Sequence, residues 1–132
     1  MSQKNHQLVR DFFRALASGS LSEDLLTGDM TAWTLTGGES DKAKVQGGVN
    51  LLATIFGGTL SYHIDAITAE QDRAVAEARS TGTLVNGEAF TNSHVFCFRI
   101  RDGRIAHVAE YMDPRVVNAQ LLPLMKTVMS SA

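Results

Sequence analysis

LSYHIDAITAEQDRAVAEARSTGTLVNGEAFTNSHVFCFRIRDGRIAHVAEYMD, residues 60–113, is the stretch that decides the fold. Two tight-turn signals, Asn86-Gly87 and Arg101-Asp102-Gly103, interrupt long segments rich in alternating apolar residues. Such short loops between strands favour hairpins. The stretch therefore predicts a curved antiparallel meander of four strands, over 60–69, 74–85, 88–100 and 104–112.

The half of the chain that precedes the meander has mainly helical periodicity. Apolar residues recur on one face of 3–18 and again of 44–56, which predicts two amphipathic helices. Ser20 with Glu23 three residues later fits a capping box. We therefore expect a short helix that begins there and runs through Leu26. The alternating segment 30–36 predicts a strand and 37–42 a polar loop. A third amphipathic segment, 115–129, is interrupted by Pro123.

Bulk properties limit the class of protein. With 132 residues, we expect one domain over 1–132, with a core at 5–113 and a C-terminal tail at 114–132. A net charge of −2 without a basic cluster argues against nucleic acid as a partner. No apolar run reaches the roughly 20 residues of a membrane span. The polar N-terminus has no signal-peptide core, and the lone Cys97 forms no internal disulfide, so we expect a cytoplasmic protein.

The order of helix, short helix, strand, helix and meander resembles the nuclear transport factor 2-like superfamily, in its SnoaL-like and ketosteroid-isomerase-like branch. The likeness rests on Ser80-Thr81-Gly82-Thr83, on residues 98–105 across the last hairpin, and on Glu110-Tyr111-Met112-Asp113. It implies an α+β fold in which a cone-shaped, curved antiparallel sheet wraps around the N-terminal helices and encloses an apolar cavity. It does not imply one reaction, since this fold hosts several.

Turn chemistry predicts which side chains share the inner face of the sheet. A two-residue turn at Asn86-Gly87 places Arg79 opposite His94. The last hairpin is ambiguous by one residue, and a slip of one residue moves every side chain to the other face. With two turn residues, His94 pairs with Tyr111. With three, it pairs with Glu110, which we favour because this puts the apolar residues on one face.

Three polar side chains in one row are then the candidate catalytic residues. Glu110 is the candidate base, His94 the partner acid, and Arg79 the group that holds the carboxylate or stabilises an oxyanion. An alternative is that Arg79 and Glu110 merely neutralise one another inside the barrel. The candidate substrate-binding residues around this row are Trp33, Tyr62, Thr81, Asn92, Phe96, Phe98, Val108 and Met112.

The motifs of the related enzymes match only in part. Arg79 and Glu110 fall at the arginine and one carboxylate position of limonene epoxide hydrolase-like enzymes, but Thr81 replaces their other carboxylate. Ketosteroid isomerases carry a base near Thr34-Leu35, where this chain has none. His94 with Glu110 best matches SnoaL-like, polyketide cyclase-like enzymes.

The resemblance and the residues together predict a small cofactor-independent enzyme, an isomerase, cyclase or lyase/hydrolase, that acts on an apolar small molecule in the cavity. The alternative is a non-catalytic module of the same fold that binds a hydrophobic ligand or dimerises. The four histidines lack metal-ligand spacing, so we expect no metal and no cofactor. Apolar outer-face residues such as Val95 and Cys97 predict a homodimer formed through the outer sheet face.

Overall fold

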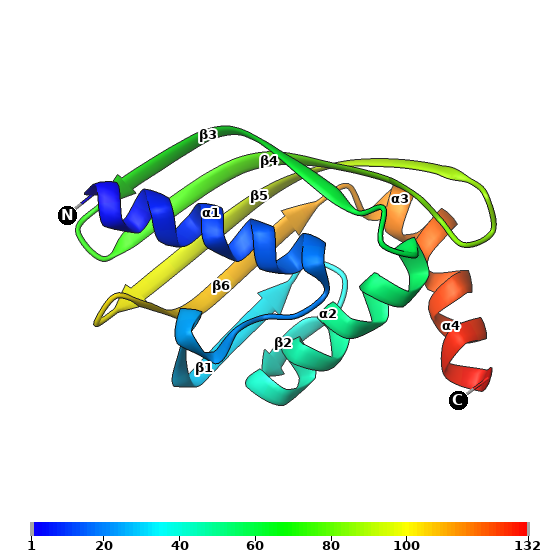
Figure 1. Ribbon diagram of the computed structural model, residues 1–132, viewed down its shortest axis with the longest axis horizontal. Coiled ribbons are helices and arrows are strands. Elements are labelled where there is room, and N and C mark those ends of the chain that lie inside the picture. Colours follow the sequence, from blue (N-terminus) through cyan, green and yellow to red (C-terminus); the bar gives the residue numbers. More distant parts are fainter. Residues whose placement is uncertain (1, 132) are drawn as a thin grey trace.

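The computed structural model describes residues 2–131, which contain helices on one face of a six-stranded sheet (Figure 1). The helical elements are α1 (Ser2–Ser18), the 3₁₀ turn η1 (Glu23–Leu25), α2 (Lys42–Phe56), α3 (Pro114–Val116), the π-helical turn η2 (Val117–Leu121) and α4 (Leu122–Ser131). The strands are β1 (Leu26–Thr34), β2 (Gly38–Asp41), β3 (Ser61–Glu70), β4 (Arg73–Thr83), β5 (Ala89–Arg101) and β6 (Arg104–Met112).

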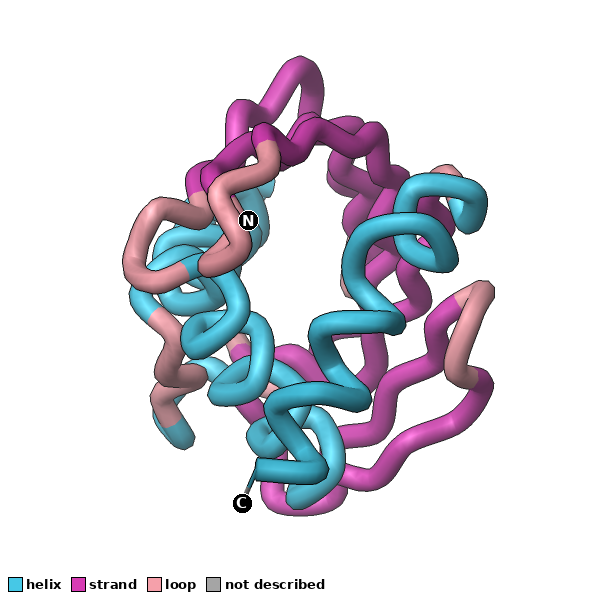
Figure 2. Tube along the Cα trace, turned by 90° about the vertical axis from the view of Figure 1, so that its right-hand side faces the viewer, coloured by secondary structure: helices cyan, strands magenta, loops and turns pink. Residues whose placement is uncertain are grey.

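The sheet has the order β2-β1-β6-β5-β4-β3, and it curves around the helices without closing. Only β1 and β6 pair in parallel; the other neighbours are antiparallel. Figure 2 shows the strands as a bent wall with the helices on its concave side. The predicted cone-shaped α+β fold is confirmed. The concave side is called the inner face below, and the convex side the outer face.

The four strands of the meander and the two long helices lie where the sequence pattern predicts them. Three local predictions were wrong. Residues 38–41 form the edge strand β2 instead of a loop. Ser22, instead of Ser20, caps the short helix by accepting a hydrogen bond from the Asp24 backbone N–H. Pro123 does not break the tail, because α4 begins only at Leu122, directly after the π-helical turn.

Buried apolar side chains form two clusters beneath the inner face. The larger cluster packs α1 against the middle strands, with edge-to-face aromatic pairs such as Phe12–Phe98 at 5.2 Å between ring centroids. The smaller joins the end of α2 to the far end of the sheet and to α4, around Ile55 and Phe56. Tyr62 packs against both clusters, so it lies at the seam between them.

The β4–β5 hairpin has a different register from the predicted one. The backbone N–H of Leu84 donates to Glu88 O at 2.9 Å, and that of Gly87 donates to Leu84 O at 2.8 Å. The loop therefore has three residues, Val85-Asn86-Gly87, with Gly87 at a φ of 90°. Arg79 pairs with Ser93 and Ala78 with His94. This one-residue slip turns Arg79 to the outer face.

The β5–β6 hairpin has the predicted faces but not the favoured loop. Asp102 and Gly103, both at positive φ, form a two-residue turn that pairs Arg101 with Arg104. Ala106 is then an extra residue on β6, since Ile100 pairs with Ile105 but Arg99 pairs with His107. This β-bulge shifts the register again. His94 consequently pairs with Met112 and Phe96 with Glu110, and Glu110 points inward after all.

Candidate active site

Three polar side chains from adjacent strands form one hydrogen-bonded row on the inner face. Ser80 on β4 lies 2.7 Å from His94 on β5, Oγ to Nε2. His94 Nδ1 lies 2.9 Å from Glu110 Oε2 on β6. The row crosses the sheet between the two apolar clusters. The predicted pair of His94 and Glu110 is therefore in direct contact.

The hydrogen bonds of the row all run in one direction, from Ser80 toward Glu110. An ionised carboxylate can only accept hydrogen bonds, so a neutral His94 carries its proton on Nδ1 and donates it to Glu110. Nε2 then accepts the hydroxyl proton of Ser80. Both ring nitrogens are engaged within the protein. A substrate would therefore contact an end of the row and not its middle.

Solvent reaches this row at the Glu110 end. Ser80 is 1% exposed and the His94 side chain 7%, whereas the Glu110 side chain is 23% exposed. Only Oε2 of Glu110 is bonded within the row. Oε1 has no hydrogen-bond partner among residues 2–131. Glu110 therefore presents one free carboxylate oxygen at the accessible end.

Tyr62 on β3 completes the site. Its ring centroid lies 5.8 Å from that of His94 and 5.1 Å from that of Phe13. Burial, and to a smaller extent the nearby charge of Glu110, raise the pKa of the Tyr62 phenol. The group therefore stays protonated at neutral pH and can donate a hydrogen bond.

The remaining predicted residues of the inner face surround the row in different ways. Asn92 is buried and holds the end of β6, since its side chain bonds both backbone groups of Asp113 at 3.3 Å. Phe96 packs against Tyr62 and His94. Phe98 and Val108 are buried in the larger apolar cluster, which makes them core residues. Met112 is half-buried beside His94.

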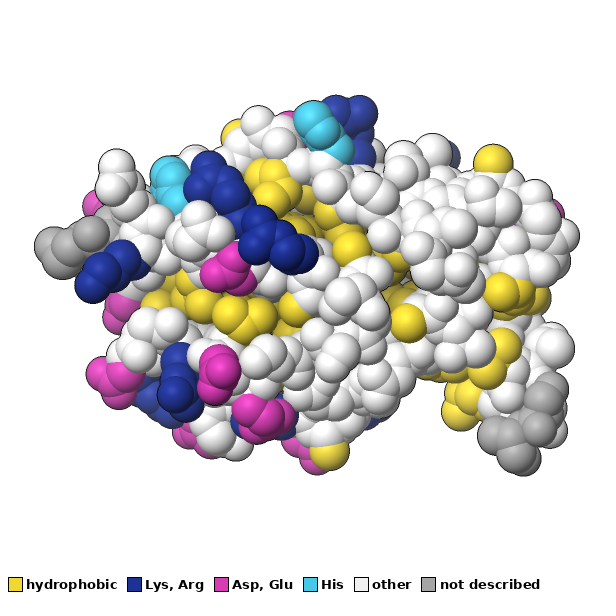
Figure 3. Space-filling view, viewed as in Figure 1, with side chains coloured by type: hydrophobic (Ala, Val, Ile, Leu, Met, Phe, Trp, Pro, Cys, Tyr) yellow, Lys and Arg dark blue, Asp and Glu magenta, His cyan; other side chains and the backbone are white. Residues whose placement is uncertain are grey.

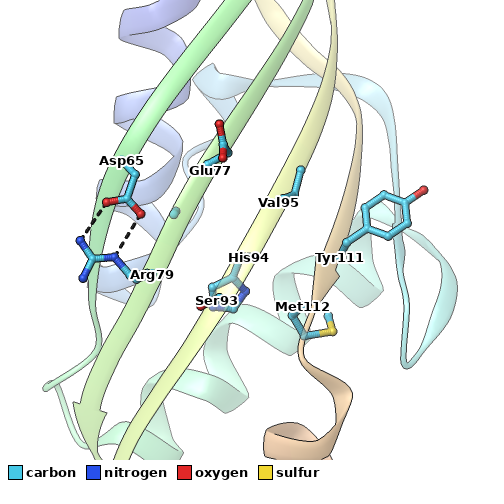
Figure 4. A pocket seen from close by; sticks show the side chains of 9 residues that line it. Asp65, Glu77, Arg79, Ser93, His94, Val95, Tyr111 and Met112 are labelled. Carbon is cyan, nitrogen blue, oxygen red and sulfur yellow. Dashed lines mark hydrogen bonds and ion pairs between the residues drawn. The ribbon is translucent and has the colours of Figure 1, made fainter.

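Three predicted site residues lie on the outer face instead, and these predictions were wrong. Arg79 donates two hydrogen bonds to Asp65, from Nε at 3.0 Å and from Nη2 at 2.8 Å (Figure 4). Thr81 is exposed on the same face, as the slip of the β4–β5 register requires. Trp33 packs against Tyr111 at 5.1 Å because its neighbour Ala32 takes the inner position opposite Val108.

Ser80 is the site residue that sequence reasoning missed. Ser80 belongs to the segment Ser80–Thr83, on which the family resemblance rests in part. The predicted two-residue turn at Asn86-Gly87, however, assigns the inner face to Arg79 and Thr81 instead. The alternation of residue types along the strand contains the signal for the correct face. Ala74, Ala76 and Ala78 are small, apolar and in phase with Ser80, whereas Val75, Glu77 and Arg79 alternate with them. That phase predicts the observed face.

Two surface hollows lie near the site, on opposite faces of the sheet. A shallow one of about 410 Å³ lies on the outer face, between Asp65, Arg79, Val95 and Tyr111 (Figure 4). A groove of about 320 Å³ lies between α1 and β3, with Phe13 and Tyr62 in its lining. No group of three or more His, Cys, Asp or Glu side chains within 2–131 has a metal-binding arrangement.

The match to a known family agrees with this architecture. Residues 9–108 match the family model of the SnoaL-like domain, and the chain belongs to that family. No curated protein matches the chain. Across residues 2–131 we find no helix with the length and apolar character needed to cross a membrane.

Several solved structures share the fold. An NTF2-like protein from Anabaena variabilis ATCC 29413 is 24% identical, with a TM-score of 0.74 over 84% of this chain and 87% of that one. IdmH from Streptomyces antibioticus, for which a polyketide-cyclase function has been suggested, is 19% identical, with a TM-score of 0.75 over 88% and 96%. AclR from Streptomyces galilaeus, a suggested hydroxylase, is 19% identical, with a TM-score of 0.77 over 96% and 83%. At these identities the likeness shows the fold.

Proposed function

We propose that the chain is a cofactor-independent acid/base enzyme that removes a proton from a carbon next to a carbonyl group in an apolar small molecule. The observation that carries this proposal is the row Ser80–His94–Glu110, which leaves Oε1 of Glu110 free at its accessible end. Glu110 is the base. His94, with both nitrogens engaged, is a positioning residue that fixes the orientation of the carboxylate.

Tyr62 supplies the second requirement of this chemistry. Removing the proton leaves negative charge on the carbonyl oxygen, which a hydrogen-bond donor must stabilise. The Tyr62 phenol is protonated at neutral pH, and it lies close enough to Glu110 for that carboxylate to contribute to the rise in its pKa. Its hydroxyl has no partner among residues 2–131. It is therefore available to a substrate oxygen.

The resulting enolate leads to either of two reactions that occur in such folds. Reprotonation at another carbon is an isomerisation, and attack on a second carbonyl within the molecule closes a ring. The cyclase function suggested for the structurally similar IdmH supports the second course. The substrate class that we propose is thus an apolar ketone or polyketide-like molecule.

Exchange of α-protons tests this proposal without knowledge of the natural substrate. We expect the protein to accelerate hydrogen–deuterium exchange at the α-carbons of 2-tetralone, followed by NMR in D₂O. Glu110→Gln removes the base and should lower the acceleration by a factor of roughly 10² or more. Glu70→Gln, which changes an exposed carboxylate at the end of β3, is the matched control and should exchange at the wild-type rate. A wild-type rate in Glu110→Gln would show that Glu110 is not the base, and a wild type without any acceleration would favour a binding module over an enzyme.

We also propose that a second copy of the chain covers the outer face. Val95 pairs with Tyr111, and Val75 with Cys97, which places these apolar side chains side by side. Val75, Val95 and Tyr111 are 39%, 37% and 46% exposed, which is unusual for neighbouring large apolar residues. Arg79, Asp65 and Glu77 around them supply both signs of charge, as a self-complementary interface requires.

A further inference from the structure

The groove between α1 and β3 combines an apolar floor with positive charge, although the chain as a whole has a net charge of −2. Its volume is about 320 Å³. The lining residues are Arg10, Phe13, Arg14, Ala17, Leu60, Ser61, Tyr62 and Ile64. Figure 3 shows Lys and Arg side chains lying next to a band of hydrophobic surface over α1.

The two arginines of the groove are not equivalent. Arg14 is 3.1 Å from Asp11, one turn earlier on α1, which partly neutralises it. Arg10 is exposed and makes no ion pair or side-chain hydrogen bond among residues 2–131. The guanidinium of Arg10 is therefore free to bind an anion, and its planar fork suits a carboxylate.

Tyr62 belongs both to the lining of this groove and to the candidate active site. Phe13 and Tyr62 lie 5.1 Å apart between ring centroids and both line the groove. Tyr62 also contacts His94 at 5.8 Å. A flat aromatic body held in the groove would therefore contact the same tyrosine that packs against His94 of the row.

We propose that this groove binds the acidic end of the substrate, and that the substrate is an aromatic or polycyclic molecule carrying a carboxylate. Arg10 binds the carboxylate at the surface, and Phe13 and Tyr62 contact the apolar body. The reacting carbon lies at the opposite end of the molecule, toward Glu110. This inference rests on the proposed function for the identity of the reacting end, but the groove itself is tested by binding alone.

Two probes of the same shape but different charge test the groove. We expect the protein to bind 2-naphthoate about five- to tenfold more tightly than the neutral 2-naphthalenemethanol, measured by titration calorimetry at pH 7 and low salt. Arg10→Gln should bring the two affinities within twofold of each other. Arg14→Gln should have a smaller effect, because Asp11 already pairs with Arg14.

The control variant is Arg104→Gln, which removes an exposed arginine from the start of β6 and should keep the full preference for the anion. Equal binding of both probes by the wild type, or an unchanged preference in Arg10→Gln, would overturn the proposal. Glu110→Gln separates the two proposals. If that variant retains both tetralone exchange and the preference for naphthoate, the proposed function fails and the groove stands.

Discussion

Tyr62 is the residue at which the two apolar clusters, the groove and the polar row meet. Its environment serves two purposes at once. Burial raises the pKa of the phenol, and the protonated hydroxyl can act as a donor. The same burial makes ionisation of the phenol unfavourable in the folded state, so stability depends on pH at this position.

The sign of that dependence follows from the raised pKa. A tyrosine in the unfolded chain has a pKa of about 10. The contribution of Tyr62 to the stability of the fold is therefore fully present below that pH and is lost above it. We expect the free energy of unfolding to fall above pH 10 by up to about 1.4 kcal/mol per pH unit. Urea denaturation at about pH 8 and at about pH 11 measures this fall in the free energy of unfolding.

Tyr62→Phe should lose most of this alkaline fall, since phenylalanine does not ionise. Tyr111→Phe is the natural comparison, because Tyr111 is the chain's other tyrosine and lies exposed on the outer face. That variant should keep the wild-type fall. If Tyr62→Phe also kept it, the phenol would not be the group responsible.

Strand β4 depends on a close contact that a single methyl group would disturb. Gly82 lies beneath the ring of Phe56, and a Cβ at this position would come within 2.6 Å of Phe56 Cδ1. Phe56 is 2% exposed and packs edge-to-face on Phe90 at 5.0 Å, so its ring has little room to move. The glycine is therefore required by packing, not by its backbone conformation.

We expect Gly82→Ala to destabilise the fold by about 1–3 kcal/mol, the usual range for overpacking a core. Gly47→Ala, at a helical position of α2 with open space around it, should instead be neutral or stabilising. Thermal unfolding of both variants measures these two changes in stability. A Gly82→Ala variant as stable as the wild type would mean that the helix α2 shifts freely over the sheet.

At the scale of the whole molecule, the two faces of the sheet have different roles. The inner face holds the core and the polar row, while the outer face carries an exposed apolar patch around Val95 and Tyr111. Burying such a patch in a symmetric contact is a common route to a dimer. The proposed dimer would leave the groove on α1 open, since the groove lies on the opposite side.

Val95→Lys tests the proposed dimer by placing a charge at the centre of the patch. We expect the wild type to sediment as a dimer at micromolar concentration and this variant to sediment as a monomer. Val85→Lys is the matched control, because Val85 is 58% exposed in the β4–β5 loop, away from the patch. A wild-type monomer, or a dimer unaffected by Val95→Lys, would contradict the proposal.

The sequence by itself determined the two long helices and the four strands of the meander, since amphipathic periodicity and turn residues are local properties. It also favoured the inner face for His94, Tyr62 and Asn92, whereas the face of Glu110 depended on the register of the last hairpin. Only the tertiary structure decided the partners of His94. The extent of each hairpin loop and the bulge at Ala106 depend on packing across strands, and a shift of one residue exchanges the faces. For that reason Ser80 took the place predicted for Arg79.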